Sequence, residues 1–579
     1  MTDLLPLRVP ARAEGALLPL MLRRFEPAML LWLVLIALLL FLVVTPLFIL
    51  VQQSFAVPEG TGYTLANYVA AFADRLHLRA LGNSLLLGAG VALLAAVFAV
   101  PMAWAVARTD MPGKNFTRVL VLGAFVTPPY LGAIGWILLA GPNAGWLNKL
   151  WMAATGAKTG IINIFSFPGL ILAIAAYSYP YIFVFTTSAL ELVSSEMEDA
   201  AHILGAGGWR TTLKVTLPLV WPAILGSLII TFLEAIALFG TPAIIGLPAH
   251  INVVTTQIWQ FFEFPVQAEV AAAYAMPLLA ITALLFWVQR RSLGRKGYVS
   301  LTGKGGERRL IKLGAWRWLL FGYTLFVGGL SVLLPFAVLL QAAFSSAWGR
   351  GLSLANLTLR NFDYVLFVHS TAGRSIIHSF VYAAAAASLA IVLALAIAYI
   401  VSRRLVPLAR ALAFLCVAPF VIPGIVLAIG FYAAYAAPPV ALYGTALLII
   451  LAFTTRFLPI AYTSCEAAMR SLNPEMEYAA RIVGGGRLTA LARIVAPLLR
   501  KSIIAAWILV FIPATRELSA AIFLTAPNTQ VMSVVLYDLS GEGNFEYLAA
   551  LGGVLLIATI VLVALSFRLV GRDFMLRRG

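Results

Sequence analysis

The sequence predicts an all-α integral membrane protein with twelve transmembrane helices, organised as two parallel six-helix repeats. Three observations lead to this fold class. The composition is far more apolar than that of a soluble domain, and the apolar residues fall into twelve long segments. In addition, a series of landmark residues recurs at one constant separation along the chain.

The amino-acid composition excludes an ordinary soluble protein. Of 579 residues, 62% are hydrophobic and 11% are charged, against about 25% charged residues in soluble domains. A chain this apolar cannot cover a water-exposed surface with polar groups, so burial in a membrane is expected. The two cysteines, Cys416 and Cys465, are too few for a disulfide framework or a cysteine-rich metal cluster, and no metal site is expected.

Each apolar segment is long enough to cross a bilayer as a helix of about 20 residues. The segments are continuous rather than alternating, which favours helices over barrel strands. The first segment is longer than a signal-peptide core and no small-residue cleavage pattern follows it, so we expect it to be a retained span. The predicted spans are 27–51, 83–107, 119–141, 167–190, 222–246, 268–289, 318–341, 378–401, 411–436, 443–464, 502–525 and 547–570.

The net charge of +17 follows this topology and does not indicate a nucleic-acid partner. Lys and Arg concentrate in alternate connections, above all in the segment 290–317 and in the C-terminal tail. Basic residues accumulate on the cytoplasmic side of membrane proteins. The pattern therefore predicts a multi-pass protein of the bacterial cytoplasmic (inner) membrane, embedded in lipid, with both termini in the cytoplasm.

The two sets of six predicted spans are related by duplication. Landmarks of the first set recur 279 residues later: Pro180, Glu198, Ala200, Ala201, Gly205, Pro218 and Pro248 correspond to Pro459, Glu477, Ala479, Ala480, Gly484, Pro497 and Pro527. Six spans per half give both halves the same orientation, so the repeats are parallel. We expect a first half at 1–289, a basic cytoplasmic linker at 290–317 and a second half at 318–579.

A polar loop between the fourth and fifth spans of each half, at 191–221 and 465–501, is the feature most informative about function. Each loop starts with acidic residues suited to a helix N-terminus. A glycine cluster then ends the first helix and permits a sharp turn, and a second short helix leads to a proline. The helix pair is expected to form a compact projection on the cytoplasmic side, with small alanines that let another protein approach closely.

These loops resemble the motif of permease subunits of binding-protein-dependent ABC importers: Glu-Ala-Ala, three residues, Gly, nine residues, Ile-x-Leu-Pro. The first loop has Asp199-Ala200-Ala201, Gly205 and Val215-x-Leu217-Pro218. The second has Tyr478-Ala479-Ala480, Gly484, Ile494 and Ala496-Pro497, and departs from the motif at the acidic position and at the leucine. The resemblance implies the type I importer permease fold and an ATPase-coupling helix in each loop. The implied coupling residues are Glu198, Asp199, Ala200, Ala201, Gly205, Glu477, Ala479, Ala480 and Gly484.

The sequence has no G-x-x-x-x-G-K-[ST] loop to hold the phosphates of ATP, so neither ATP hydrolysis nor a cofactor is expected on this chain. The chain is expected to be a transport subunit without catalytic residues. The resemblance implies two copies of a separate ABC ATPase subunit, which bind ATP and Mg, one under each loop. It also implies an extracytoplasmic (periplasmic) binding protein that delivers substrate to a pathway formed by the fused halves.

Four charged residues inside predicted spans are candidates for the translocation pathway, because a charge within a bilayer is costly. They are Glu234, Arg456, Arg516 and Glu517; a helix-to-helix ion pair or a snorkelling arginine is the alternative explanation for each. The segments around Glu234 and Arg516-Glu517-Leu518 resemble those of the ferric-iron branch of the family, although Leu238 stands where an acid commonly precedes Phe-Gly. Ferric iron is the predicted substrate, with aminoethylphosphonate, polyamine or thiamine as alternatives.

Two other classes of membrane protein are the competing hypotheses. An ion-coupled secondary transporter can also have two parallel six-helix halves. However, the loop ARTDMPGKNFTR lacks the G-x-x-x-D-x-x-G-R-[KR] signature of the common facilitators. A membrane enzyme would need paired carboxylates, a His cluster or a nucleophile–base set, and the sequence indicates none of them.

Overall fold

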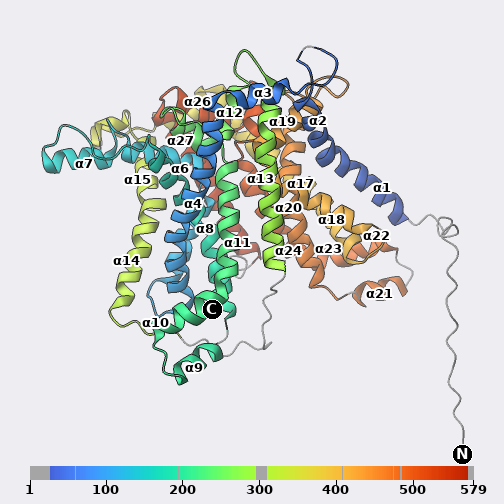
Figure 1. Cartoon of the computed structure of the whole chain (residues 1–579), viewed down its shortest axis with the longest axis horizontal. Coiled ribbons are helices and arrows are strands. Elements are labelled where there is room, and N and C mark those ends of the chain that lie inside the picture. Colours follow the sequence, from blue (N-terminus) through green and yellow to red (C-terminus); the bar gives the residue numbers. More distant parts are fainter. Residues whose placement is uncertain are drawn as a thin grey trace, which may run out of the picture.

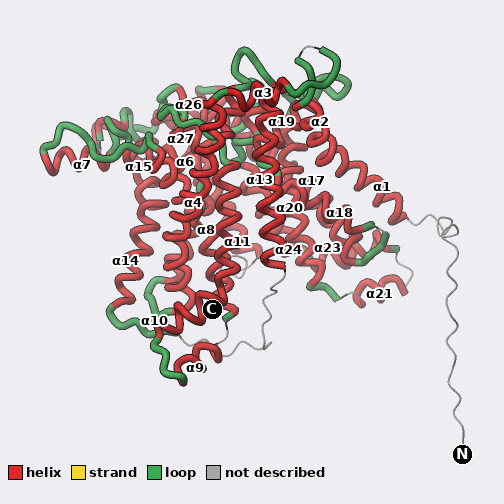
Figure 2. The backbone as a smooth tube through the Cα atoms, viewed as in Figure 1, coloured by secondary structure: helices red, strands yellow, loops and turns green. Residues whose placement is uncertain are grey.

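The computed structural model describes residues 27–570, apart from positions 59, 194, 295–309, 352, 407, 474 and 483–485. Every regular element among these residues is a helix, and strand-like pairing is confined to three isolated bridges. Long helices run side by side through the molecule, and short helices cover its two ends (Figures 1 and 2). The all-helical membrane fold predicted from the sequence is confirmed.

The first half of the described chain comprises thirteen α-helices and three π-helical turns. They are α1 (Pro27–Leu39), η2 (Leu40–Val44), α2 (Thr45–Ser54), α3 (Ala66–Ala73), α4 (Arg75–Arg108), α5 (Lys114–Val126), α6 (Pro129–Ala140), α7 (Trp146–Thr155), α8 (Phe167–Leu192), α9 (Ser195–Ile203), α10 (Gly208–Thr211), η3 (Thr212–Thr216), α11 (Leu217–Ala237), η4 (Pro242–Gly246), α12 (Val254–Gln260) and α13 (Ala268–Gly294).

The second half follows the same plan. Its elements are α14 (Trp316–Gly328), η5 (Gly329–Leu333), α15 (Leu334–Ala343), η6 (Trp348–Arg350), η7 (Leu354–Asn356), α16 (Arg360–Asp363), η8 (Tyr364–Val368), α17 (Ser370–Ser402), α18 (Ala409–Val417), η9 (Ala418–Val421), α19 (Gly424–Tyr435), α20 (Ala446–Arg470), α21 (Glu475–Ile482), α22 (Arg487–Ala490), η10 (Leu491–Val495), α23 (Ala496–Leu498), α24 (Arg500–Thr515), α25 (Ala521–Leu524), α26 (Met532–Gly541) and α27 (Phe545–Val570).

Among the described residues, nine helices are long and apolar enough to cross a membrane, and three bent pairs raise the number to twelve if each pair is one span. α5 and α6 meet at 102°, and α18–η9 and α19 meet at 112°. Proline lies at both breaks, at Pro128-Pro129 and at Pro423, and it cannot continue the hydrogen-bond ladder of a helix. The spans predicted at 119–141 and 411–436 are therefore each broken into two helices instead of forming one straight helix.

Each of these two bent pairs nevertheless crosses the molecule once. We call the end that carries α9 and α21 the loop side, and the opposite end the far side (Figure 1). α4 and α17 end on the loop side, where α5 and α18 then begin. α8 and α20 are continuous spans that lead directly into α9 and α21, so they start on the far side. The bent pairs that precede them must therefore travel from the loop side to the far side. With the third bent pair, Leu491–Leu498 and Arg500–Thr515, counted as one span, the described residues make twelve crossings.

The fifth and eleventh spans end earlier than the sequence predicted. α11 ends at Ala237 rather than near 246, and Leu238 has an extended backbone. Pro242 has no N–H to donate to the carbonyl of Leu238, which explains why the helix stops there. α24 ends at Thr515 rather than near 525, directly before Arg516. It is also bent by 73° from the segment Leu491–Leu498 that precedes it.

The first helix of each half packs on the opposite half. α1 and α2 contact α17, α18 and α19, whereas α14 and α15 contact α4, α5 and α6. Figure 1 shows α14 beside α4 at one edge of the molecule and α1 beside α18 at the other. This exchange holds the two halves together, because separating them would remove the first helix of each half from the helices against which it packs.

The two halves differ in length between their second and fourth spans. Residues 141–166 of the first half contain the additional helix α7, which projects from one edge of the molecule (Figure 1). In the second half, α19 and α20 are joined by residues 436–445 alone. The constant separation of 279 residues found in the sequence therefore begins only after this insertion.

Candidate functional site

The first coupling loop is a helix–turn–helix on the loop side. α9 ends at Ile203, and Gly205 then has a left-handed backbone with φ of +84°, a conformation that glycine adopts without steric cost. Nδ1 of His202 lies 2.8 Å from the carbonyl oxygen of Ala206 and closes the turn. Ile203 and Leu204 are 86% and 87% exposed, so the turn presents an apolar surface to its surroundings.

Glu198 faces the protein rather than the solvent. Its carboxylate forms a buried ion pair with Arg108, the last residue of α4. The hydroxyl of Thr216 donates a second hydrogen bond to the same carboxylate at 2.7 Å, and Arg108 Nη1 also donates to the carbonyl of Val193 at 3.3 Å. A buried charge requires such partners. Glu198 therefore fixes α9 against the ends of α4 and η3.

The other coupling residues predicted in this loop lie nearer the surface. Ala200 is exposed, whereas Asp199 and Ala201 are half-buried. Together with Ile203 and Leu204, they leave α9 accessible along one side. The loop thus has an inner residue that holds it in place and an outer surface with accessible apolar side chains.

The second coupling loop repeats this arrangement. Glu477 on α21 is buried and accepts hydrogen bonds from Nε and Nη2 of Arg403 at 2.8 and 2.5 Å. Ile482 is 86% exposed, as Ile203 is, and Tyr478 is exposed at the position that corresponds to Asp199. Gly484 and the side chains of Ala479 and Ala480 lie outside the described residues.

The two arginines that anchor the loops were missed by reasoning from the sequence. Arg108 and Arg403 each stand at the loop-side end of the second span of their half, 295 residues apart. A search at the constant separation of 279 residues does not pair these arginines, because the α7 insertion lies between them and the coupling loops and increases their separation. A search for repeats with a variable separation, restricted to charged residues at span ends, would have found both.

All four charged residues predicted for the translocation pathway border one cavity between the halves. The cavity has a volume of about 180 Å³ and is lined by Glu234 from the first half and by Arg456, Arg516 and Glu517 from the second. A smaller cavity of about 90 Å³ shares Glu234 and Arg456 with it. The first cavity lies at the break between α5 and α6, and the second lies at the break between η9 and α19. The broken helices therefore create the space.

Both arginines stabilise the broken helix ends. Arg516 Nη1 donates to the carbonyl oxygens of Phe125 and Val126 at 2.8 Å each, across the boundary between the halves. Arg456 Nη1 donates to the carbonyl of Ile422 at 2.6 Å, within its own half. The last carbonyls of a helix lack intrahelical partners and carry a partial negative charge, which a guanidinium group satisfies. Neither arginine forms an ion pair with Glu234 or Glu517 in the described structure.

The carboxylates and phenols of the larger cavity are less fully engaged. Glu517 accepts a hydrogen bond from the backbone N–H of Ala520 at 3.0 Å. Glu234 has neither an ion pair nor a hydrogen bond among the described residues. The hydroxyls of Tyr130 and Tyr177 border the cavity and are buried without a hydrogen-bond partner. No group of three or more His, Cys, Asp or Glu side chains in the described part of the chain is placed to hold a metal ion.

Known proteins resemble this chain along most of its length. Residues 95–296 match the family described as binding-protein-dependent transport system inner membrane component. A ferric transport system permease protein of Actinobacillus pleuropneumoniae is 26% identical over 524 residues, which cover 89% of this chain and 74% of that protein. A molybdenum transport system permease protein of Escherichia coli K12 is 29% identical over 230 residues, which cover 37% of this chain and 96% of that protein. A solved chain of a bacterial ABC transporter involved in alginate import is 19% identical, with a TM-score of 0.38, and covers 45% of this chain and 96% of that chain.

The twelve crossings, the exchanged first helices and the paired loops define a duplicated membrane transport protein. The match to the family and the similarity to the permeases make the assignment more specific. Residues 95–296 match the family of binding-protein-dependent transport system inner membrane components, and the chain is a permease subunit of an ABC importer. It is a multi-pass protein of the inner membrane whose partners are an ATPase and a binding protein, and the resemblance seen in the loop motif is confirmed.

Proposed function

We propose that this permease conducts ferric iron through a pathway between its two halves. The observation that carries the proposal is the cavity that Glu234 and Glu517 border from opposite halves, together with Tyr130, Tyr177 and Tyr181. Carboxylate and phenol oxygens are hard donors that suit a small, highly charged cation. The similarity to the Actinobacillus ferric permease along 89% of the chain supports this choice.

The charge balance of the cavity suits passage rather than tight binding. Two guanidinium groups, of Arg456 and Arg516, offset the two carboxylates, so negative charge is not concentrated at one point. A transport site must bind its substrate well enough to admit it and weakly enough to release it. The backbone carbonyls hold the two arginines away from the carboxylates, which leaves the oxygen donors available.

The coupling loops are proposed to provide the contact with the ATPase subunits. The exposed Ile203 and Ile482 are proposed to enter grooves on two copies of a separate ABC ATPase, which binds ATP and Mg. In this arrangement the loop side is cytoplasmic, both termini are cytoplasmic, and a periplasmic binding protein docks on the far side. Glu198 and Glu477 act as positioning residues, because each holds its coupling helix without facing the partner.

The proposal retains the division of the chain into halves at 1–289 and 318–579, joined by a cytoplasmic linker at 290–317. The Escherichia coli molybdenum permease supports it, because almost the whole of that protein aligns with 37% of this chain. One chain of the present length therefore has room for two such units. Fusion would ensure that each first half is paired with a second half. This matters because Arg456, Arg516 and Glu517 of the cavity all come from the second half, so two first halves could not form it.

Aminoethylphosphonate is a second candidate substrate. The two arginines match a phosphonate and the two carboxylates match an amine, so the cavity is complementary in charge to a zwitterion. Ferric iron is preferred because both arginines already donate to backbone carbonyls.

The decisive experiment reconstitutes the chain with its ATPase and binding protein in vesicles and measures ATP-dependent uptake of labelled ferric iron. Glu234→Gln is expected to lower uptake about tenfold or more, the usual effect of losing one charge-assisted contact, while the protein stays folded and assembled. Glu263→Gln is the matched control, because Glu263 is exposed and borders neither cavity. A binding protein that takes an amine or a phosphonate and ignores ferric iron would show that the substrate is wrong.

A further inference from the structure

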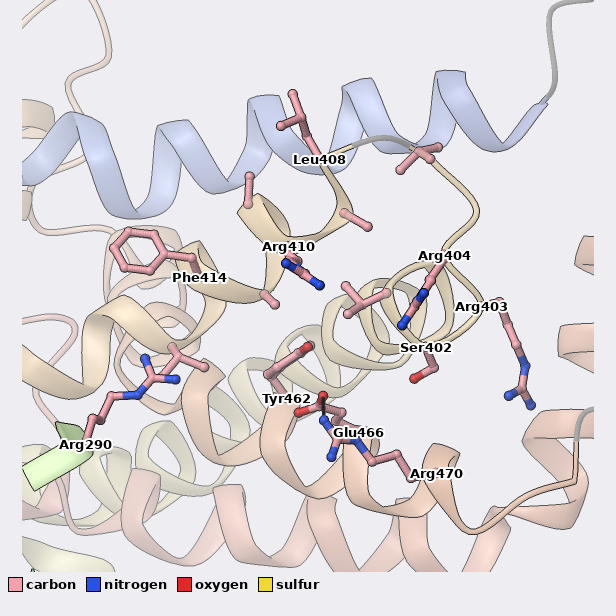
Figure 3. Close-up of a pocket in the computed structure, with 16 residues that line it drawn as sticks. Arg290, Ser402, Arg403, Arg404, Leu408, Arg410, Phe414, Tyr462, Glu466 and Arg470 are labelled. Carbon is pink, nitrogen blue, oxygen red and sulfur yellow. Dashed lines mark hydrogen bonds and ion pairs between the residues drawn. The ribbon is translucent and has the colours of Figure 1, made fainter. Parts of the chain in front are cut away.

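A large cavity on the loop side lies outside the translocation pathway. It has a volume of about 890 Å³ and is lined by Arg290, Arg403, Arg404, Arg410, Arg470 and Glu466; we call it the arginine pocket. Figure 3 shows these residues arranged on separate helices around one space beneath α1, with the Arg403 side chain at its edge. Five guanidinium groups around a single carboxylate give the pocket a net positive charge, which attracts an anion.

Ion pairing within the described chain neutralises only part of this charge. Arg403 is paired with Glu477 and Arg470 with Glu466. Arg290, Arg404 and Arg410 have no ion pair among the described residues. Arginine presents its donors in a planar fork that matches the oxygens of a phosphate. The free positive charge therefore favours a phosphate-bearing ligand.

Two neutral side chains of the pocket point to the same conclusion. The hydroxyl of Tyr462 is buried without a hydrogen-bond partner, and the residue is 2% exposed. The hydroxyl of Ser402 is also buried and unpartnered. Both residues line the pocket near Arg404 and Arg410 (Figure 3). Buried polar groups in proteins are nearly always paired, and these two hydroxyls can donate to the oxygens of an anion bound beside the arginines.

The pocket lies at the edge of the membrane. It is bordered by the loop-side ends of three candidate spans, Ala268–Arg291, Ser370–Ser402 and Ala446–Arg470. Phe414 and Leu408 line it as well, yet their side chains are largely exposed. A cationic centre flanked by exposed apolar side chains at a span boundary matches an amphipathic ligand with an anionic headgroup and a hydrocarbon tail.

In the described part of the first half, the place that corresponds to this pocket is closed. Thr109 stands at the position of Arg404 and is fully buried, because the backbone of Ile311 pairs with it. Gly113 stands at the position of Leu408, and a Cβ there would come within 2.4 Å of the Phe321 ring. The start of the second half therefore seals this place in the first half, so the arginine pocket is a specific feature of the second half.

We propose that the arginine pocket binds the phosphate headgroup of an anionic phospholipid, with the acyl chains lying along Phe414 and Leu408. Arg403 connects this site to function, since it borders the pocket and holds Glu477 of the second coupling loop. A bound headgroup relieves the repulsion around Arg403 and stabilises the anchor of that loop. Lipid composition thereby regulates the second coupling loop and leaves the first unaffected.

The test measures binding of phosphatidylglycerol and phosphatidylcholine to the purified full chain. It also measures how far each lipid raises the thermal unfolding temperature of the chain. Phosphatidylglycerol is expected to bind the chain and raise its unfolding temperature, whereas phosphatidylcholine is expected to do neither. Arg404→Gln with Arg410→Gln should weaken phosphatidylglycerol binding about 25-fold, at about fivefold for each basic side chain near an anionic surface. Arg350→Gln with Arg360→Gln is the matched control, because both residues are exposed on the far side.

Other outcomes overturn the proposal. Equal binding of the two lipids, or equal losses in the two double variants, would show that the pocket is not a specific headgroup site. Inorganic phosphate that stabilises the chain as strongly as phosphatidylglycerol at equal concentration would identify a soluble anion as the ligand. If the double variant does not fold, Arg290→Gln on the separate helix α13 repeats the measurement. Binding is measured without substrate or ATPase, so failure here is distinct from failure of the ferric-iron proposal.

Discussion

The two coupling loops use the same anchor in different surroundings. In both, a glutamate in the first short helix pairs with an arginine at the loop-side end of the second span, as Glu198 does with Arg108 and Glu477 with Arg403. The side chain of Arg108 is 3% exposed, whereas that of Arg403 is 15% exposed and borders the arginine pocket. The first anchor is therefore sealed and the second is open on one side.

The neighbours of the two anchors have also diverged. Thr216 donates a hydrogen bond to Glu198, but Val495 occupies the equivalent position in the second loop. Tyr399 lies near Glu477, and Trp104 stands at the position that corresponds to Tyr399 in the first half. Both halves therefore keep the charge pair, whereas the residues around it differ. The loops are equivalent in position, but they should differ in stability and in their response to surroundings.

The largest effect is expected from removing the sealed arginine. Arg108→Met leaves the Glu198 carboxylate buried without a counter-charge and should lower the free energy of unfolding by about 3–5 kcal/mol. Arg403→Met should cost less, because Arg403 borders the pocket and water from the pocket can take the place of its guanidinium group. Thermal unfolding of the purified chain measures both. Adding Glu198→Leu to Arg108→Met should restore most of the loss, since no buried charge then remains; equal losses in the two single variants would contradict the distinction between sealed and open anchors.

The next prediction tests whether the two coupling loops contribute equally to binding of the ATPase. Ile203→Asp and Ile482→Asp each place a charge at an exposed apolar tip and should weaken binding of the ATPase about 30-fold, the loss typical of one interface hot spot. Co-purification and titration with the ATPase provide the measurement. Phe264→Asp is the control, because Phe264 is 97% exposed but lies on the far side. An effect in one loop only would mean that the two contacts are not alike.

A smaller effect is expected when the first anchor is made to resemble the second. Thr216→Val removes the hydrogen bond to Glu198 and should lower the free energy of unfolding by about 1.5 kcal/mol, as expected for one hydrogen bond to a charged group. Thr212→Val in the same π-helical turn is the control, since Thr212 donates only to the carbonyl of Gly208. No difference between the two variants in chemical or thermal unfolding would show that Arg108 alone holds the carboxylate.

The smallest effect concerns the turn of the first loop. Gly205→Ala forces a side chain into a left-handed backbone, although no atom lies within 4 Å of the added Cβ. The strain should cost about 1 kcal/mol and reduce stimulation of the ATPase by the loaded binding protein. Gly207→Ala meets the same open space without a positive φ and should have little effect. Equal effects of the two changes would assign the role of Gly205 to flexibility rather than to its conformation.

The sequence by itself determined much of the architecture. Hydrophobicity is a local property, so the number of spans and the positions of the coupling loops could be predicted from the length of each apolar run. The duplication was visible because short motifs such as that of Ala200, Ala201 and Gly205 survive divergence. Charged residues such as Glu234 stood out because a bilayer tolerates few of them.

The tertiary structure decided which of these residues meet. Arg516 of the second half supports the carbonyls of Phe125 and Val126 in the first, across nearly 400 positions of sequence, and the first helix of each half lies on the other. The anchors Arg108 and Arg403 and the arginine pocket are likewise products of helix packing. Such contacts depend on how whole helices pack and bend against one another, a global property that no single segment encodes.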